Sequence, residues 1–311
     1  MSKSKKLLTV SICTYNRSQN LQPLISLLRK QQVQIPFEIL IVNNNSTDNT
    51  IQVLEKLRKE PGVKLRFVTE TQQGIPYARN RAVSESLQSD YMFFMDDDEE
   101  PVPGLLEATI NALMNEDADC AGGKVQIAFE SFQRPSWLSD SLLGFLAEID
   151  HGPNPFWITD ISTPLWTANI AYNMKIFRSN PTLRFDHRYN RIGNTIGGGS
   201  DSIMFKEQVK RKFKIRYRPD MVVRHHVEKW RIKRSYFLKL HYLSGKKKGM
   251  YEMKTEGKTL FGISRFMYLQ LMKKTLHSFK LYMIKDSEYT REAMNASHLL
   301  GQMIGLATRP S

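Results

Sequence analysis

Cysteine is scarce in this 311-residue sequence, which contains only Cys13 and Cys120 and no C-x-x-C pair or Cys/His array. This scarcity excludes a disulfide scaffold, a zinc finger and a dithiol redox motif. Long apolar runs are also missing, since no segment reaches the ~20 residues that a membrane-spanning helix requires. The first strand-like segment, 7–13, is too short for a signal peptide, so we expect a cytoplasmic protein.

Phosphate-binding glycine motifs are absent as well. Neither G-x-x-x-x-G-K-S/T nor G-x-G-x-x-G follows the first strand-like segment. Their absence excludes a P-loop enzyme and a dinucleotide-binding fingerprint. A metal-dependent nucleotidyltransferase, which would need a glycine-rich phosphate loop at this place, is therefore only an alternative.

Acidic residues are few in one segment of the chain. Residues 206–285 contain 23 basic and 5 acidic residues, a net charge of +18, whereas the whole chain carries +14 and the remainder therefore −4. Such a segment can meet nucleic acid, anionic lipid or a phosphorylated substrate. No RRM, KH, zinc-finger or helix-turn-helix pattern is present, so a nucleic-acid-binding protein is the weaker alternative and we expect no nucleic-acid partner.

Short apolar segments alternate with segments of helical spacing in the first third of the chain. The expected strands are 7–13, 37–43, 63–69 and 91–95. Ser46 is expected to cap the helix after the second strand, and Pro103 suits the first turn of a helix that runs to about Met114. This order predicts an α/β fold, with a Rossmann-like, mostly parallel sheet flanked by helices.

A run of five acids, Asp96 to Glu100, directly follows the last of these strands. Crowded carboxylates repel one another and raise each other's pKa unless a cation neutralises them. Oxygen ligands of this kind suit Mg²⁺ or Mn²⁺, which commonly bind one or two carboxylates together with substrate phosphates. Because ligands bind beyond the carboxyl ends of strands in such sheets, the polar segments after all four strands are expected to converge.

Four segments carry a more specific signal. They are VSICTYNR at 10–17, VNNNSTD at 42–48, GIPYARN at 74–80 and FMDDD at 94–98. In this order they resemble the motifs of family-2 glycosyltransferases, over roughly residues 7–235. The resemblance implies a GT-A fold and inverting transfer of a sugar from a nucleoside diphosphate donor, expected to be UDP-linked, to an acceptor hydroxyl. It also implies a D-x-D motif that holds Mn²⁺ or Mg²⁺ on the diphosphate.

The resemblance assigns roles to individual residues. Thr14 and Tyr15 would line the nucleoside pocket, and Asn43 would stand where many members have an aspartate that contacts the base. Asp96 and Asp98 would be the D-x-D pair that binds the metal. The full set of donor-binding residues expected in this way is Thr14, Tyr15, Asn16, Arg17, Asn43, Asn45, Arg79, Asp96 and Asp97.

The acceptor side has its own set of expected residues. Trp166, Thr167 and Asn169 would contact the acceptor. Asp201 would be the general base, since only the Asp of the family's Glu-Asp pair is retained in Ser200-Asp201. The alternative for Asp201 is the capping of a helix over 202–209.

The resemblance also implies that a histidine at about residue 225 completes the metal site. Alternation along a strand lets only one of His225 and His226 face it, and the spacing to Arg231 favours His225.

We expect a catalytic domain over 1–228, with a nucleotide-sugar half at about 1–128 and an acceptor half at about 129–228. A basic, amphipathic helical region would follow over 229–311. Its segment 229–243 interleaves Lys and Arg with large apolar residues, and Lys246, Lys247 and Lys248 follow. This composition indicates either an interfacial anchor on an anionic membrane or a packed helix. The first alternative would place the protein on the inner face of the cell membrane, acting on a lipid-linked acceptor in cell-surface polysaccharide or glycolipid synthesis.

Overall fold

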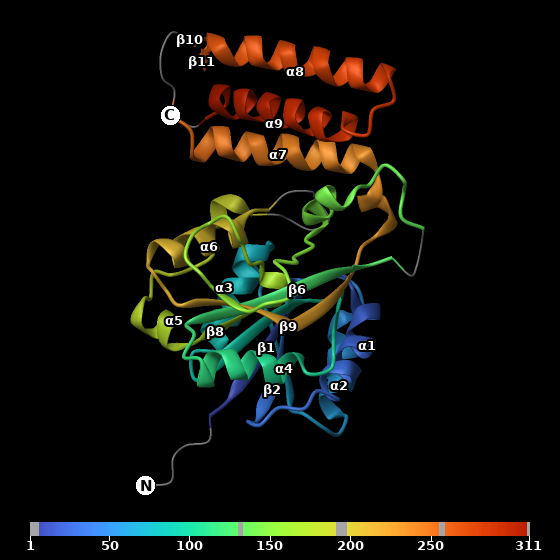
Figure 1. The fold of residues 1–311 in the computed structure, drawn as a ribbon. Coiled ribbons are helices and arrows are strands. Elements are labelled where there is room, and N and C mark those ends of the chain that lie inside the picture. The colour runs from blue at the N-terminus through green and yellow to red at the C-terminus, as the bar shows by residue number, and fades with distance from the viewer. Residues whose placement is uncertain (1–5, 130–132, 191–197, 255–258, 310–311) are drawn as a thin grey trace. The chain divides into compact units, whose positions relative to one another are not determined.

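The computed structural model describes residues 6–129, 133–190, 198–254 and 259–309 (Figure 1). The chain divides into two compact units. The first comprises Met1–Ala128, Ala147–Asn194 and Gly199–His226, and the second comprises Phe129–Leu146, Thr195–Gly198 and Val227–Ser311.

The first unit opens with alternating strands and helices. In chain order these are β1 (Leu8–Thr14), α1 (Ser18–Leu28), β2 (Phe37–Asn43), α2 (Thr50–Lys59), β3 (Leu65–Thr69), α3 (Ile75–Glu85), β4 (Tyr91–Asp96), β5 (Glu99–Pro101) and α4 (Leu105–Ile110). The rest of the unit contains β6 (Cys120–Ala128), β7 (Phe156–Ile158), β8 (Ile170–Asn173), α5 (Lys175–Ser179), α6 (Ser200–Lys210) and β9 (Ile215–His226).

These strands form one mixed sheet in the order β3-β2-β1-β4-β8-β6-β9-β5, with β7 paired to β9. The strands β3, β2, β1 and β4 are mutually parallel, so their carboxyl ends lie at one edge. The register pairs Thr14 with Asn43 and Cys13 with Asp96. The polar residues after β1, β2 and β4 are therefore brought together by the pairing itself.

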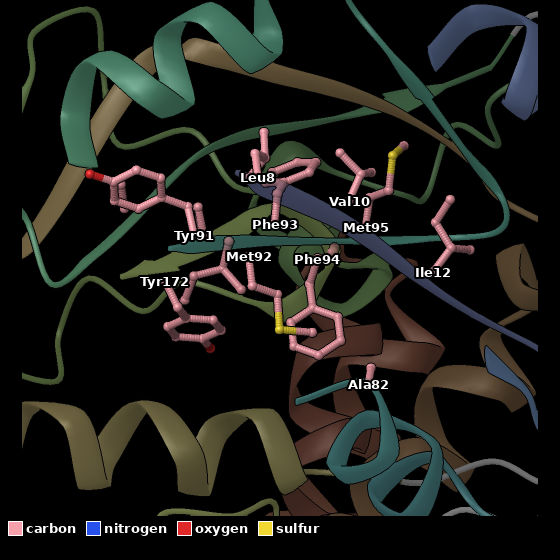
Figure 2. Packing of buried hydrophobic residues seen from close by; sticks show 14 of the residues in the cluster. Leu8, Val10, Ile12, Ala82, Tyr91, Met92, Phe93, Phe94, Met95 and Tyr172 are labelled. Atoms are coloured by element: carbon pink, nitrogen blue, oxygen red, sulfur yellow. The ribbon is translucent and has the colours of Figure 1, made fainter. Parts of the chain in front are cut away.

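The core of the first unit lies on both faces of this sheet. Residues 91–95 of β4 are all buried, which requires helices or loops over both faces because side chains alternate along a strand. Figure 2 shows Phe93 and Met95 directed to one face with Val10 of β1, and Phe94 directed to the other toward Ala82 of α3. With its apolar residues enclosed, the strand presents polar residues only where it ends.

The predicted strands agree with β1 to β4 to within two residues at each end. The helix expected from Pro103 to Met114 begins at Leu105 and changes to a π-helix over Asn111–Asn115. The expected cap at Ser46 is wrong, because α2 begins at Thr50 and Asp48 accepts hydrogen bonds from the Thr50 amide (3.1 Å) and hydroxyl (2.5 Å). The Ser46 hydroxyl instead accepts from the Asn16 amide in the neighbouring loop (3.0 Å).

The second unit is built from three long helices, α7 (Arg234–Tyr251), α8 (Arg265–Met283) and α9 (Tyr289–Ala307). A two-stranded ribbon of β10 (Thr259–Leu260) and β11 (Ile263–Ser264) precedes α8. Within this unit α9 lies between α7 and α8 (Figure 1). No helix in the described part of the chain is both long enough and apolar enough to cross a membrane.

Glycines let α7 and α9 approach to backbone contact. Gly245 and Gly249 of α7 face the carbonyls of His298 and Gln302, while Gly301 and Gly305 of α9 face the carbonyls of Tyr242 and Lys246. A Cβ at any of the four positions would collide with the opposing backbone oxygen. These small residues, spaced four apart on each helix, set the distance between the two helices.

Replacing Gly249 by alanine should therefore force α7 and α9 apart. We expect Gly249→Ala to lower the free energy of unfolding by about 1–3 kcal/mol, the usual cost of an overpacked contact. Urea denaturation followed by circular dichroism measures the change. Gly144→Ala is the matched control, because a Cβ at Gly144 meets no atom within 4 Å, and it should leave stability nearly unchanged. Equal stability of the two variants would contradict the packing.

Candidate active site

The acidic run after β4 is divided between buried and accessible side chains. Asp97 and Glu99 are buried, whereas the side chain of Asp96 is 39% exposed and that of Asp98 is 11% exposed. The short strand β5 causes this division, because it pairs Glu99 with His225 of β9 and turns the chain back into the sheet. Asp96 and Glu100 (40% exposed) are the most accessible carboxylates of the run, and Asp98 remains partly exposed.

Arg17 neutralises part of the acidic run. Its Nη1 lies 2.7 Å from Asp97 Oδ1 and 2.8 Å from Asp98 Oδ2, so one guanidinium bridges two carboxylates. The Thr14 hydroxyl donates a second hydrogen bond to Asp97 Oδ2, at 2.6 Å. The end of β1 is thereby tied to the end of β4 by charge as well as by strand pairing.

Burial still leaves two of the acids hard to ionise. It raises the pKa of Asp97 to about 6, against the lowering effect of Arg17. It raises the pKa of Glu99 well above its ordinary value, with further increases from Asp96 and Asp98. Glu99 Oε2 accepts from the Asp96 amide (2.7 Å), and Glu99 Oε1 forms no hydrogen bond with the described residues. Glu99 is a site residue that the sequence motifs missed, although the acidic run contains it.

The two histidines of β9 face different neighbours. His225 is buried, with Nε2 3.9 Å from Asp98 Oδ1 and Nδ1 3.9 Å from Glu99 Oε1. His226 points the other way and has Nε2 2.9 Å from Glu100 Oε1. The strand alternation therefore brings His225 to the acid cluster formed by Asp96, Asp97, Asp98 and Glu99, whereas His226 meets Glu100.

Arg79 links the acid cluster to the first turn of α6. Its Nη2 lies 3.8 Å from Asp96 Oδ1, and its Nη1 donates to the Ser200 hydroxyl at 3.4 Å. Asp201 follows Ser200 in the first turn of α6, and the N-cap residue of this helix is Gly199 rather than Asp201. The Asp201 side chain is half-buried. Its neighbour Ser200 is linked to Asp96 through Arg79.

The loops after β1 and β2 are joined by asparagine side chains. Asn16 and Asn45 adopt left-handed backbone conformations (φ 51° and 58°) that asparagine tolerates. Asn16 Oδ1 accepts from the Thr47 amide at 2.7 Å. Asn43 is fully buried and accepts from the Ser46 amide at 3.1 Å, whereas Tyr15 is half-buried and Asn45 is exposed.

The residues expected on the acceptor side differ in accessibility. Trp166 is half-buried, and Thr167 is buried with a hydroxyl that forms no hydrogen bond with the described residues. Asn169 is fully buried, and its Nδ2 donates to the carbonyls of Lys124 and Met221, both at 2.9 Å. These two bonds join β6 to β9 beside their register shift, which gives Asn169 a structural role.

A cavity of about 770 Å³ lies elsewhere in the first unit, bounded by α3, residues 182–188 and α6. Its lining includes Tyr77, Asn80, Arg81, His187 and Arg211 but none of the expected site residues. Three arginines of its lining are paired with acids, Arg81 with Glu85, Arg188 with Asp186 and Arg211 with Glu207. The acid cluster, which contains the unbalanced charge, is the better candidate for the active site.

The donor set at the cluster suits a hard divalent ion. Carboxylate oxygens of Asp96 and Asp98 and the imidazole of His225 are ligands that Mn²⁺ accepts. Among the described residues, no three His, Cys, Asp or Glu side chains are gathered closely enough to enclose an ion by themselves. Ions of this class commonly complete their shell with substrate phosphates and water, so the residues fit a metal that binds with a diphosphate.

Comparison with known families identifies this arrangement. The model of "Glycosyl transferase family 2" matches residues 9–181, more than half of the chain. The chain belongs to this family. The four motifs after β1, β2, β3 and β4 all lie in the matched region, which confirms the family predicted from them.

Relatives and solved structures agree with this family. The chain is 30% identical over 121 residues to the uncharacterized glycosyltransferase YibD of Escherichia coli, covering 39% of this chain and 34% of that protein. It is 29% identical over 92 residues to the poly(ribitol-phosphate) β-N-acetylglucosaminyltransferase TarS of Staphylococcus aureus, covering 29% of this chain and 16% of TarS. The chain thus spans well under two thirds of the length of either relative.

Two solved structures share the fold. The mannosyltransferase PcManGT of Pyrobaculum calidifontis, in complex with GDP-Man and Mn²⁺, aligns with a TM-score of 0.61 at 14% identity over 96% of this chain and 86% of that one. TarS residues 1–349, in complex with UDP-GlcNAc, align with a TM-score of 0.53 at 17% identity over 79% and 68%. These alignments confirm the GT-A fold.

Removal of Arg17 tests the charge balance of the cluster. We expect Arg17→Gln to lower the free energy of unfolding in EDTA by roughly 2 kcal/mol, less than the 3–5 kcal/mol of a fully buried pair because Arg17 is partly exposed. Added Mn²⁺ should raise the Tm of this variant more than that of wild type, since the ion replaces the lost positive charge. Urea denaturation in EDTA measures the first change, and differential scanning fluorimetry measures the Tm shifts.

The control for this experiment is Arg58→Gln, which removes an exposed arginine paired with Glu55 on α2. Its Tm should stay close to that of wild type with or without Mn²⁺. An identical Mn²⁺ response in the Arg17 variant and in wild type would show that Arg17 and the ion do not act on the same carboxylates.

Proposed function

We propose that this family-2 protein transfers a sugar from a UDP-sugar to an acceptor hydroxyl with inversion at the anomeric carbon. The observation that carries the proposal is that Arg17 and Arg79 join the end of β1, the acidic run after β4 and the start of α6. Arg17 links the end of β1 to Asp97 and Asp98, and Arg79 links Asp96 to Ser200 of α6. Donor-binding and proton-accepting groups would thus share one edge of the sheet. Membership in the family favours sugar transfer over nucleotidyl transfer.

The donor would lie across the carboxyl ends of β1, β2 and β4. Tyr15 and the loop containing Asn16 and Asn45 would contact the nucleoside, with Thr14 and Asn43 buried beneath them. Asp96, Asp98 and His225 would hold a divalent ion against the diphosphate. That ion, when bound, would neutralise charge on the departing nucleotide. Support for a nucleotide-sugar donor comes from the neighbours solved with UDP-GlcNAc and GDP-Man.

The reaction proposed is a single in-line displacement. The acceptor oxygen forms a bond to the anomeric carbon, the bond from that carbon to the phosphate oxygen breaks, and the nucleoside diphosphate leaves. Asp201 takes the proton of the attacking hydroxyl as a general base. Trp166 and Thr167 would position the acceptor. Asn169 would support the site indirectly, through the hydrogen bonds by which it joins β6 to β9.

The acceptor class proposed is a lipid-linked or surface-polysaccharide precursor on the inner face of the cell membrane. The net charge of +18 over residues 206–285 supports a partner with negative charge. A sugar acceptor held at an anionic membrane would meet this requirement. TarS, whose name states poly(ribitol-phosphate) as its acceptor, is a relative that acts on a phosphate-containing polymer.

The role of Asp201 is tested by Asp201→Asn. Transfer should fall by ~10²–10⁴-fold, the usual contribution of a general base, while donor binding persists. Product formation from a panel of UDP- and GDP-sugars measures transfer, and thermal protection measures donor binding. Protection should approach about 2.7 kcal/mol at a donor concentration of 100 times Kd. Transfer within a few-fold of wild type would mean that another group accepts the proton.

The role of Asp98 requires a separate variant. Asp98→Asn should lose both transfer and Mn²⁺-dependent donor protection, because the carboxylate is assigned to the ion. Asp160→Asn, at an exposed position in the same unit, is the matched control and should retain both. Full Mn²⁺-dependent protection of the Asp98 variant would overturn the metal assignment without affecting that of Asp201.

A further inference from the structure

An apolar stripe runs along the solvent-facing side of α8. Its residues follow one another at intervals of three and four and are each between 54% and 64% exposed: Leu269, Met272, Leu276, Phe279 and Met283. Phe261 and Phe266 near the start of the helix and Tyr282 and Ile284 near its end extend the exposed apolar surface, with Phe261 at 84%. A contiguous surface of this kind marks an interaction site more often than scattered apolar residues do.

The opposite side of α8 packs against α9. Met267 is buried and Leu271 is half-buried, and both pack with Leu299 and Met303 of α9. Positions 267, 271 and 278 lie on one face at helical spacing, and the exposed stripe lies on the other. The stripe is therefore not needed to attach α8 to α9.

The charges beside the stripe identify the chemistry of its partner. Lys273 and Lys280, seven residues apart, lie along one border of the stripe, and both are exposed. Helix α8 contains no Asp or Glu. A second copy of this chain packed along the same stripe would bring another helix with four cations and no acid, so the two copies would repel each other. An anionic bilayer offers apolar chains to the stripe and phosphates to the lysines, as in interfacial amphipathic helices.

We infer that the exposed face of α8 docks on the surface of an anionic lipid bilayer. The helix lies in the interface and does not cross it, in agreement with the lack of a helix suited to spanning among the described residues. Phe261 and Phe266 enter the acyl boundary, while Lys273 and Lys280 extend toward headgroup phosphates. This surface lies in the second unit and does not depend on the proposed transfer reaction.

The structure also changes which helix meets the membrane. The sequence left segment 229–243, which covers the start of α7, as either an interfacial anchor or a packed helix. In the structure Tyr236 and Phe237 of α7 are buried, and Phe237 packs edge-on against Trp137 (5.4 Å between ring centroids). Lys247 is partly buried, and its Nζ donates to the Gly198 carbonyl at 3.1 Å. These α7 side chains are engaged within the second unit.

Vesicle sedimentation of the full chain tests this inference. Wild type should bind vesicles of phosphatidylcholine with phosphatidylglycerol, bind vesicles of phosphatidylcholine alone much less, and dissociate in high salt. A variant with Leu276→Glu and Phe279→Glu should lose binding by roughly tenfold or more. A variant with Lys273→Gln and Lys280→Gln should bind anionic vesicles roughly tenfold less and neutral vesicles unchanged.

Two controls keep the outcome interpretable. Ile161→Glu places a single glutamate at a 57%-exposed isoleucine of the first unit and should bind anionic vesicles like wild type. Thermal protection by the nucleotide-sugar donor should be equal in all variants, so failure of membrane binding is distinguishable from failure of the transferase. Equal binding to both vesicle types, or to neither, would overturn the inference. Self-association in sedimentation velocity that the Leu276/Phe279 variant abolishes would assign the stripe to a second copy instead.

Discussion

Five consecutive acids at the end of a buried strand must be neutralised, and the edge of the first unit where β1, β2 and β4 end is arranged around this constraint. The parallel pairing of β1 with β4 brings Arg17 to Asp97 and Asp98, and Thr14 adds a hydrogen bond from the same strand end. Pairing of β5 with β9 buries Glu99 beside His225. Strand pairing therefore places the partners of these buried carboxylates, which water cannot solvate. The same topology leaves Asp96 and Asp98 accessible to a ligand.

Residues that look alike in the sequence take different structural roles. Asp97 and Asp98 are adjacent and both pair with Arg17, yet Asp97 is buried and also accepts from Thr14, whereas Asp98 is partly exposed. Asn169 is one of three neighbouring candidates for acceptor contact, but its amide joins two strands instead. Burial separates supporting residues from those that can touch a substrate, because a side chain whose donors are already used in the interior is not available to a ligand.

The second unit illustrates how close helix packing creates a surface. Four glycines allow α7 and α9 to meet backbone to backbone, so α9 has one side filled by α7 and another by α8. Helix α8 contacts α9 with only one of its two apolar faces. The remaining face, bordered by lysines, is the surface that we propose to dock on an anionic bilayer.

The sequence by itself determined the strands β1 to β4, the acid run and the family, because hydrophobic periodicity and short motifs are local properties of the chain. It also indicated a basic helical region at the C-terminal end. Tertiary structure decided the rest. Helix α2 begins at Thr50, whose amide donates to Asp48 and not to Ser46. The Ser46 hydroxyl accepts from the Asn16 amide instead. Glu99 became part of the site through pairing with a strand more than 100 residues away. The exposed apolar surface lies on α8 and not at the start of α7, because Tyr236 and Phe237 of α7 are buried within the second unit. Each of these outcomes depends on groups distant in the sequence competing for the same hydrogen bond or the same surface, which local patterns do not encode.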